Sequence, residues 1–320
     1  MPLPRRVLPA LSAALAMPAL AQPRFPQGPV RLVVPYVPGG ATDIQARALA
    51  QRLSAMWGQQ VLVENRPGGN TVLATELVAR APADGHTLLV AAMPFALNPS
   101  MYDRLPYDSD RDIAPVSLIS QVPLALIVNK DGPLRSVADL VAFARDRRGQ
   151  ASFGSPGIGA TPHLAGEMLC AAAGIEMVHA PYRGGAAVHA DLMGGRVTTV
   201  FDTGAWGLIA QGQVRAIAVT TARRVATLPA VPTMEESGFP GFTITAWHGV
   251  MATGGVPPDR IAWISAQIAE ALRHEDVATR FDALAAERIG STPEATRDFI
   301  AGEQRRFATL IRERNIRPDS

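Results

Sequence analysis

The segment Pro35–Asp43, PYVPGGATD, joins an apolar run to a helical pattern. The run VRLVV comes before it, and IQARALAQRLSAMW follows it, with Leu49, Leu53 and Trp57 repeated at helical spacing. A strand that passes through a glycine-rich turn into a helix is the basic unit of α/β folds, and their ligands bind at such turns. The segment therefore predicts an α/β protein with a ligand near Gly39 and Gly40.

The alternation of strands and helices continues along the chain. QVLVENR and HTLLVAAM predict strands with the helix TVLATELVARA between them, and a Pro-rich stretch without an expected helix then runs to Ser109. A second series of strands and helices begins near Gln121 and ends with RAIAVTT. TITAWHGVMA predicts one more strand. The remainder is helical, with a single apolar face that consists of Ile261, Ile264, Ile268 and Leu272.

The domain organisation follows from the length of this helical tail. The tail is too short for an α/β domain of its own, so we expect it to pack on the first series. Two chain crossings, near LALIVNK and RAIAVTT, then join lobe 1, residues 22–122 plus 223–320, to lobe 2, residues 123–222. The prediction is a two-lobed α/β fold with mainly parallel sheets flanked by helices and a ligand cleft between the lobes.

The first residues differ in composition from the rest. Arg5 and Arg6 precede an apolar run of fifteen residues, and Ala19-Leu20-Ala21 has the small-x-small pattern of a signal peptidase site. Residues 1–21 therefore predict a signal peptide and a periplasmic protein. A membrane anchor is the alternative, but the run is shorter than the roughly 20 residues that span a bilayer. The arginine pair leaves the twin-arginine route open.

The charge and cysteine content exclude several classes of protein. Without Arg5 and Arg6, 28 of the 30 basic side chains remain, and they balance the 28 acidic ones, which argues against nucleic acid as a partner. Cys170 is the only cysteine, so no disulfide can form within the chain. Its apolar surroundings predict a buried, inert thiol.

The turn in PYVPGGATD fits two interpretations. Gly39 and Gly40 let the backbone approach a ligand, and either Thr42 or Asp43 can cap the helix, so that the first-turn amides attract an anion. An ordinary tight turn with a helix cap is the other interpretation.

A second stretch, FGSPGIGATPHLAGE, repeats the pattern from Phe153 to Glu167. Ser155 and Thr161 supply hydroxyl groups, and Pro162 suits an early helical position. If both turns face the cleft, they hold opposite sides of one small anion. Because neither turn contains a lysine or arginine, the pair suits a carboxylate better than a polyphosphate.

Other chemistry is weakly represented. No P-loop occurs, and Pro162 breaks the dinucleotide-binding pattern of glycines, so no cofactor is expected. His163 and Glu167 could form half of a metal site, but His179 and His189 lack suitable spacing, so we expect no metal. The remaining candidates are Asp202, which fits either a ligand contact or a helix cap, and the possible pocket-wall residues Phe95, Asn98, Trp206 and Trp247. The run RDRR, residues 145–148, is interpreted as a solvated helix end.

Ten stretches together resemble one family, the solute receptors of tripartite tricarboxylate transporters, also called Bug proteins. They are VRLVVPYVPGGATDIQAR, QVLVENRPGG, ARAPADGHTLLVA, LNPSMYDRLPYD, RDIAPVSLI, FGSPGIGATPHLAGEM, VHAPYRGG, VRAIAVTT, LPAVPTMEESGFPG and WHGVMATGGVPPD. The stretches occur in the family's order and cover nearly the whole chain after residue 21.

The resemblance implies a periplasmic receptor of the type II class, without catalytic activity, that closes on a small carboxylate and delivers it to membrane permease subunits. It also implies that ligand contacts come from the two turns and from an acidic position of the second lobe, namely Pro38, Gly39, Gly40, Thr42, Asp43, Ser155, Gly159, Thr161, His163 and Asp202. The family often has more glycine where this chain has Asn70, Thr71 and Ala74, and a proline or alanine at Val37. These departures, together with Phe95, bear on the identity of the ligand.

The sequence thus predicts a monomeric solute-binding protein with no cofactor. One alternative is an exported enzyme that uses Asp43, His163 or Asp202 for acid–base chemistry on a small carboxylate. Another is a ligand sensor that docks on a membrane signalling protein.

Overall fold

The computed structural model describes residues 25–182 and 184–318, so the predicted signal peptide lies outside the described residues. Within this part, eleven strands form two sheets. The six-stranded sheet has the spatial order β11 (Glu287–Arg288), β4 (Ile113–Pro123), β10 (Thr245–Thr253), β3 (Thr87–Ala92), β1 (Val30–Val34) and β2 (Val61–Asn65). The five-stranded sheet has the order β7 (Val178–Pro181), β6 (Ser152–Ser155), β8 (Thr199–Asp202), β5 (Ala125–Asn129) and β9 (Val214–Val219).

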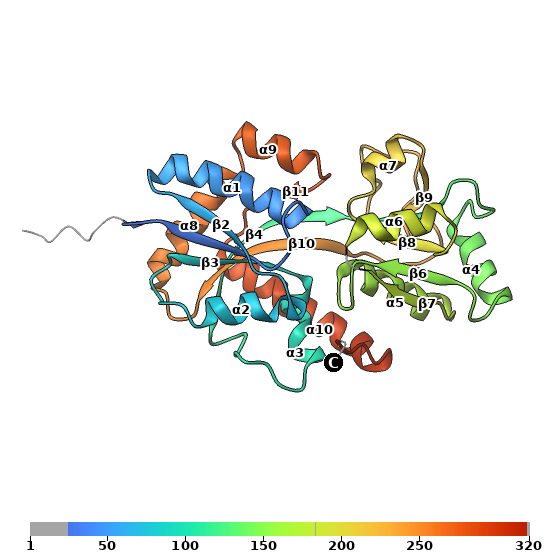
Figure 1. Ribbon diagram of the computed structural model, residues 1–320, viewed down its shortest axis with the longest axis horizontal. Coiled ribbons are helices and arrows are strands. Elements are labelled where there is room, and N and C mark those ends of the chain that lie inside the picture. Colours follow the sequence, from blue (N-terminus) through green and yellow to red (C-terminus); the bar gives the residue numbers. More distant parts are fainter. Residues whose placement is uncertain (1–24, 183, 319–320) are drawn as a thin grey trace, which may run out of the picture.

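Helices cover both faces of each sheet, and the two layered units lie side by side (Figure 1). We call the six-stranded sheet with its helices lobe 1 and the five-stranded sheet with its helices lobe 2. The helices of lobe 1 are α1 (Ala41–Trp57), α2 (Val72–Ala79) with the short 3₁₀ turn Gly69–Thr71, α3 (Met93–Met101), α8 (Pro258–Ala271), α9 (Glu275–Asp282) and α10 (Pro293–Glu313). Those of lobe 2 are α4 (Val137–Asp146), α5 (Thr161–Ala173), α6 (Gly185–Met193) and α7 (Trp206–Ala210).

Alternating side chains along the strands divide the core between the two faces of each sheet. In β1, Val33 packs with α2, α3 and α10, whereas Leu32 and Val34 pack with α1, α8 and α9. In β5, Leu126 faces α4 and α5, and Ile127 faces α6. Successive side chains of a strand point to opposite faces of the sheet. Because consecutive residues of these strands are apolar, helices must cover both faces.

Both sheets are mixed, which corrects the expectation of mainly parallel sheets. In lobe 1 the strands β2, β1 and β3 are parallel, but β10, β4 and β11 pair antiparallel. In lobe 2 the strands β7, β6 and β8 are parallel, and β5 pairs antiparallel with β8 and β9. The antiparallel strands β4, β5, β9 and β10 are those next to the chain crossings, where the chain leaves one sheet for the other.

Two elements were not predicted. The Pro-rich stretch after β3 begins with helix α3, which tolerates Pro94 in its first turn and has Pro99 inside it. The strand β4 is eleven residues long and lies between β10 and β11, although no strand was expected between Ser109 and Gln121. The polar residues Ser117 and Ser120 in β4 are fully buried, so the sequence of this central strand lacks a clear apolar pattern.

The two chain crossings meet at Thr220. Only Leu124 separates β4 from β5, and the hydroxyl of Thr220 receives a hydrogen bond from the Leu124 amide (3.1 Å) and donates to the Ile244 carbonyl (2.6 Å). The main chain of Thr220 also pairs with Leu124 and Ile244. One buried residue thus connects the first crossing to both ends of the second.

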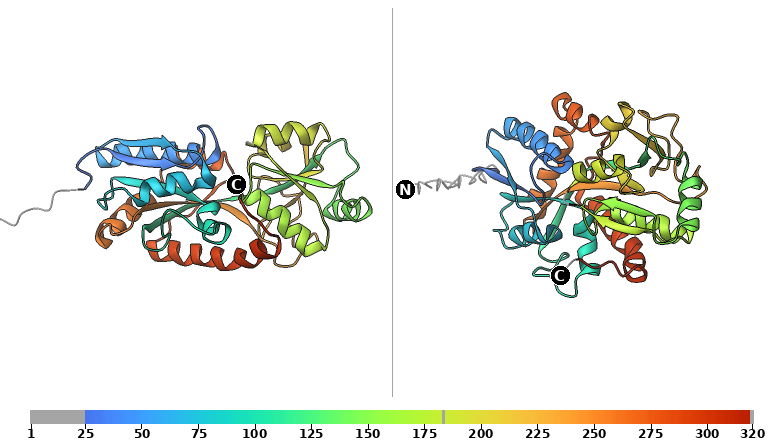
Figure 2. Two further views of the ribbon diagram at one scale, coloured as in Figure 1. Left: turned by 60° about the horizontal axis from the view of Figure 1, so that its bottom comes forward. Right: turned by 45° about the vertical axis from the view of Figure 1, so that its right-hand side comes forward.

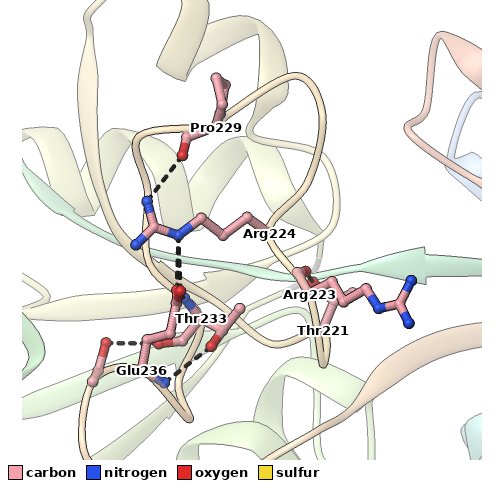
Figure 3. Close-up of polar contacts among 7 residues, drawn as sticks. Thr221, Arg223, Arg224, Pro229, Thr233 and Glu236 are labelled. Carbon is pink, nitrogen blue, oxygen red and sulfur yellow. Dashed lines mark hydrogen bonds and ion pairs between the residues drawn. The ribbon is translucent and has the colours of Figure 1, made fainter.

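The segment between β9 and β10 is braced locally (Figure 3). Arg224 donates to Glu236 (2.8 Å) and to the Pro229 carbonyl (3.0 Å), and Glu236 exchanges hydrogen bonds with Thr233. These contacts hold the long excursion of the second crossing as a closed loop, so that its ends can meet at Thr220.

Helix α10 lies along lobe 1 and ends next to lobe 2 (Figure 2). It packs on α3 and β4, and Arg314, at its C-terminal end, donates to Glu167 of α5 at 2.6 Å. This ion pair crosses between the lobes. Among residues 25–182 and 184–318, no helix has both the length and the apolar composition needed to cross a membrane.

Candidate functional site

The two predicted turns lie at corresponding edges of the two sheets. The turn Pro38–Gly40 follows β1, whose carboxyl end lies beside those of β2 and β3 because the three strands are parallel. The turn that begins at Ser155 follows β6, whose carboxyl end lies beside those of β7 and β8. Ligands of α/β sheets bind outside such edges.

In the first turn, Asp43 holds the backbone of Gly39. Its Oδ2 accepts hydrogen bonds from the Gly39 amide and from Arg47 Nε, both at 2.9 Å, and its Oδ1 accepts from Asn65 at 2.9 Å. Burial by itself would raise the pKa of Asp43, but the hydrogen bonds from Arg47, Gly39 and Asn65 outweigh burial and lower it. Gly39 has φ +91°, a conformation that glycine adopts without strain.

Thr42 also points into the protein. Its Oγ1 lies 2.9 Å from Nε2 of His248, a buried residue of β10 whose Nδ1 lies 3.2 Å from Ser120 Oγ. Ser120 in turn donates to Gln45 Oε1 at 2.5 Å. Burial lowers the pKa of His248 to about 4, so the imidazole is neutral at physiological pH. This chain of hydrogen bonds fastens the start of α1 to β4 and β10.

In the second turn, His163 has the position that Asp43 has in the first. Its Nδ1 accepts a hydrogen bond from the Gly159 amide at 3.0 Å, and Gly159 has φ +74°. On the other side of the ring, Nε2 lies 3.6 Å from Glu167, which also binds Arg314. Burial alone would raise the pKa of Glu167, but hydrogen bonds from His163 and Arg314 lower it.

Ser155 forms the hydroxyl–histidine pair of the second turn. Its Oγ lies 2.7 Å from His179 Nε2 and also hydrogen-bonds the main chain of Gly157. The His179 ring stacks on His163 with centroids 3.8 Å apart, and Phe153 stacks on both rings. Burial and the neighbouring His163 lower the pKa of His179 to about 4.

These contacts correct the prediction that Thr42 or Asp43 caps α1. The N-cap is Gly40, and no side chain caps α1; the N-cap of α5 is Ala160, and it too lacks a side-chain cap. Thr42 and Asp43 bind His248 and Gly39 instead, because both side chains point inward. Apart from Pro162, which has no N–H, the first-turn amides of both helices therefore keep their hydrogen-bonding capacity, which gives each edge donors without a side-chain cap. Pro162 lies in the first turn of α5, as predicted.

The two lobes touch next to the second turn. A methyl group placed on Gly159 would lie 2.8 Å from Met101 Cε and 3.2 Å from Asn70 Nδ2, both in lobe 1. The edge of lobe 2 that carries the turn thus faces the β2–α2 loop and the end of α3. Two hollows on the surface, of about 540 and 580 Å³, are lined by other residues, around α10 with the 238–242 segment and around the chain crossings.

The other residues predicted for the site are either exposed at the first edge or buried in the fold. Pro38, Gly39 and Gly40 are exposed at the first edge, and Thr161 is buried in the first turn of α5. Asp202 is 8% exposed and bonded to His189 and to the Gly204 amide. The helix-cap interpretation is wrong, because the N-cap of α7 is Ala205 and no side chain caps this helix. Phe95 is buried in the core of lobe 1 at the start of α3. Asp43, His163 and Asp202 are thus all committed to contacts within the fold.

Several secondary expectations also have outcomes. Cys170 is buried, and burial raises its pKa to about 11, as expected of an inert thiol. Trp247 lies in the core, and Trp206 is half-buried and donates to the Thr203 carbonyl. Residues 145–148 are exposed at the end of α4. The described part of the chain contains no group of three or more metal-ligating side chains.

The sequence reasoning missed the partners of the turn residues. Arg47 follows Asp43 by four residues, so helical spacing could have indicated their ion pair. Asn65, His179, His248 and Arg314 come from distant parts of the chain, and no local pattern marks them.

Two braced turns with free amide donors on facing lobes define a two-lobed binding protein. A family model described as "Tripartite tricarboxylate transporter family receptor" (TctC) matches residues 45–316, and the chain belongs to this family.

Solved structures agree with this assignment. The chain is similar to the periplasmic binding protein BugD, with 33% identity, coverage of 92% of this chain and 100% of that chain, and a TM-score of 0.82. It is also similar to an R. palustris protein solved with adipate (33% identity, 92% and 100% coverage, TM-score 0.85). A third neighbour is MatC from Rhodopseudomonas palustris, solved with malate (28% identity, 90% and 100% coverage, TM-score 0.81). The family is one of solute receptors, in keeping with the two-lobed architecture.

Proposed function

We propose that this protein captures a small carboxylate between its lobes, with the turn after β1 on one side and the turn after β6 on the other. The observation that carries the proposal is the pair of uncapped helix starts, each of which follows a glycine held by a side chain four residues later. Because the braces are already formed, the amides are preorganised, and little order is lost on binding. Adipate and malate in the related structures are carboxylates of the size that such a site would accept.

The proposal assigns the ligand contacts to the residues that the sequence predicted at both edges. Main-chain amides of α1 and α5 would bind the carboxylate oxygens, with Pro38, Gly39 and Gly40 forming the exposed approach. Thr42, Asp43, Ser155 and His163 would act mainly as braces behind the amides. Phe95 and Asp202, both nearly buried, would bound the site without binding the carboxylate.

The proposal extends to the cell biology of the protein. Residues 1–21 would act as a signal peptide that directs export to the periplasm, and the monomeric receptor would deliver its solute to the permease subunits of a tripartite tricarboxylate transporter. Residues 22–122 plus 223–320 and residues 123–222 would move as two bodies about the crossings at Leu124 and Thr220. The hydrogen bonds of Thr220 to both crossings support this placement of the hinge.

Binding can be tested by a thermal-shift screen of the purified protein against carboxylates, amino acids and nucleotides, with calorimetry on the hits. A carboxylate at a hundredfold its Kd should stabilise the protein by about 2.7 kcal/mol, which raises the Tm by about 5 °C. Shifts confined to nucleotides, or a ligand recovered chemically altered, would contradict the proposal.

The position of the site can be tested with Gly40→Val. Gly40 is exposed and has an ordinary φ, and a methyl group placed on it would have nothing within 4 Å, so the fold should tolerate the substitution. The valine would stand before the amides of α1 and should weaken carboxylate binding by about a hundredfold, or about 2.7 kcal/mol. Gly28→Val, at an equally open glycine away from both edges, is the matched control and should bind as the wild type does.

A further inference from the structure

The loop between β2 and α2 has an unusual backbone. Gly68, Gly69, Asn70 and Thr71 have φ values of +127°, +55°, +48° and +74°. Asparagine enters the left-handed region at moderate cost, but a β-branched threonine rarely does. A run of this kind persists only where its surroundings hold it in place.

Asn98 of α3 holds this loop. The side chain is fully buried, and its Nδ2 donates to the Asn70 carbonyl at 3.0 Å and lies 3.4 Å from Thr71 Oγ1. Its Oδ1 accepts from Asn70 Nδ2 at 3.0 Å. The two carboxamides therefore fix each other and the backbone between them.

This network also decides which way the Asn70 side chain points. A main-chain carbonyl can only accept, so Asn98 must present its NH₂ group to the Asn70 carbonyl and its oxygen to the Asn70 side chain. Asn70 must then present Nδ2 to Asn98, and its Oδ1 faces away. Asn70 is partly exposed, and Oδ1 has no hydrogen-bond donor among the residues that the structure describes.

Asn70 lies where the two lobes meet. Its Nδ2 is 3.2 Å from a methyl position on Gly159, so it faces the turn of lobe 2, and its loop follows β2, next to the turn after β1. The side chain thus borders the proposed carboxylate site on the lobe 1 side. It adds an acceptor to a site whose other contacts are donors.

The two acidic side chains predicted for the site, Asp43 and Asp202, already have hydrogen-bond partners. Asp43 is 2% exposed and accepts from Gly39, Arg47 and Asn65, and Asp202 binds His189 and Gly204. A hydroxyl or ammonium group on a bound carboxylate needs an acceptor, and Asn70 Oδ1 is an acceptor without a donor among the described residues, on a side chain that lies where the lobes meet.

We propose that Asn70 is a specificity-determining residue, whose Oδ1 accepts a hydrogen bond from a hydroxyl or ammonium group of the ligand. The receptor then prefers hydroxy- or amino-carboxylates to the same acids without that group. This inference rests on the proposed function, because it places Asn70 beside a carboxylate held by the two turns.

The variant Asn70→Gly tests the inference. Glycine suits φ +48°, so the substitution removes the carboxamide without straining the backbone. Asn315→Gly is the matched control, because Asn315 is exposed, has φ +47°, and lies beyond α10. The probes are paired: succinate with malate and aspartate, glutarate with glutamate, and phenylacetate with mandelate.

Calorimetry should show that the wild type and Asn315→Gly bind the substituted acid of at least one pair about tenfold more tightly than its partner. In Asn70→Gly this ratio should fall to about one, while the affinity for the unsubstituted acid stays within about twofold. An unchanged ratio in Asn70→Gly, or equal binding of both members of each pair by the wild type, would overturn the inference and leave carboxylate binding intact. If the wild type binds no carboxylate at all, the proposed function fails and the inference fails with it.

Discussion

The turn after β1 and the turn after β6 have the same hydrogen-bond pattern but different chemistry. In each, a glycine with positive φ donates its amide to the side chain four residues later, and a hydroxyl group pairs with a histidine. The acceptor is the Asp43 carboxylate in lobe 1 and the His163 imidazole in lobe 2. The bond from the glycine amide to a side chain four residues later is thus built twice, once with a carboxylate and once with an imidazole as acceptor.

The difference lies in what each acceptor needs. The charge of Asp43 is balanced inside lobe 1, by Arg47 with help from Asn65. His163 instead connects through Glu167 to Arg314, which belongs to the other lobe. The first turn is therefore self-contained, whereas the shape of the second depends on how the lobes meet.

A fall in pH should have the largest effect on the free energy of unfolding, because a neutral histidine pairs with a hydroxyl group of each turn. The folded state holds His248 and His179 neutral, with pKa values of about 4, whereas an unfolded histidine titrates near 6.5. Below pH 6.5 the unfolded chain binds protons that the folded protein does not, so the stabilisation is complete above pH 6.5 and is lost as the pH falls to about 4. Each of the two histidines should lower the free energy of unfolding by about 3 kcal/mol over this pH range.

Urea titrations between pH 7.5 and 4.5 measure this loss. His179→Gln should remove about half of the pH dependence and leave the part that belongs to His248. A free energy of unfolding that does not change over this range would contradict the assignment of both histidines as neutral groups.

Truncation of the two acceptor side chains should destabilise the protein by different amounts in the two turns. Asp43→Ala leaves the Gly39 amide, Asn65 and Arg47 without their acceptor and should lower the free energy of unfolding by about 3 kcal/mol. His163→Ala leaves the Gly159 amide without its acceptor, removes one of the two partners of Glu167 and removes a stacked ring, at a cost of about 2 kcal/mol.

Chemical denaturation gives both values, and Asp43→Asn serves as the control for shape. It should recover part of the loss, because one oxygen remains but the charge opposite Arg47 does not. A larger loss for His163→Ala than for Asp43→Ala would reverse the comparison.

Substitution of Gly39 and Gly159 should give the smallest difference in stability between the two turns. Gly39→Ala places a methyl group in open space, so only the strain of φ +91° remains, at about 1 kcal/mol. Gly159→Ala has a similar strain and also meets Met101 Cε at 2.8 Å, so it should cost about 2 kcal/mol.

The double variant Gly159→Ala with Met101→Ala distinguishes strain from contact, by comparison with each single variant. A positive coupling in urea titrations would show that the methyl group meets Met101. Equal costs for Gly39→Ala and Gly159→Ala would mean that the lobes do not touch there in solution.

The sequence predicted the strand–turn–helix units well, because each is marked by a local change of pattern. The apolar face of Ile261, Ile264, Ile268 and Leu272 is buried as expected. Helix α3 escaped prediction because its prolines suggested a loop, and β4 because its buried serines interrupt the apolar run. The antiparallel pairing of β10 with β3 and β4 depends on contacts more than a hundred residues apart, which periodicity does not record.

For the candidate site, the structure places the two predicted turns at the carboxyl edges of the sheets, but some of their side chains have other roles than the sequence predicted. Thr42 and Asp43 are frequent caps, and only the tertiary structure brings His248 and Asn65 close enough to turn them inward. Likewise, the spacing of His163 and Glu167 suggested half of a metal site, and Arg314 completes an ion pair instead.

The junction at Thr220 is a single narrow connection about which the two lobes would rotate. A single residue lies between β4 and β5, and both crossings are bonded to one hydroxyl group. If the lobes rotate about this junction as we propose, stiff strands would carry a small rotation to the far ends of the lobes. Arg148 beyond α4 and Gln51 on α1 are both exposed and lie on different lobes. Dyes attached at these two positions would report on the relative movement of the lobes. The receptor would therefore be suited to conversion into an optical sensor of its own solute, with no change at the edges that we propose as its binding site.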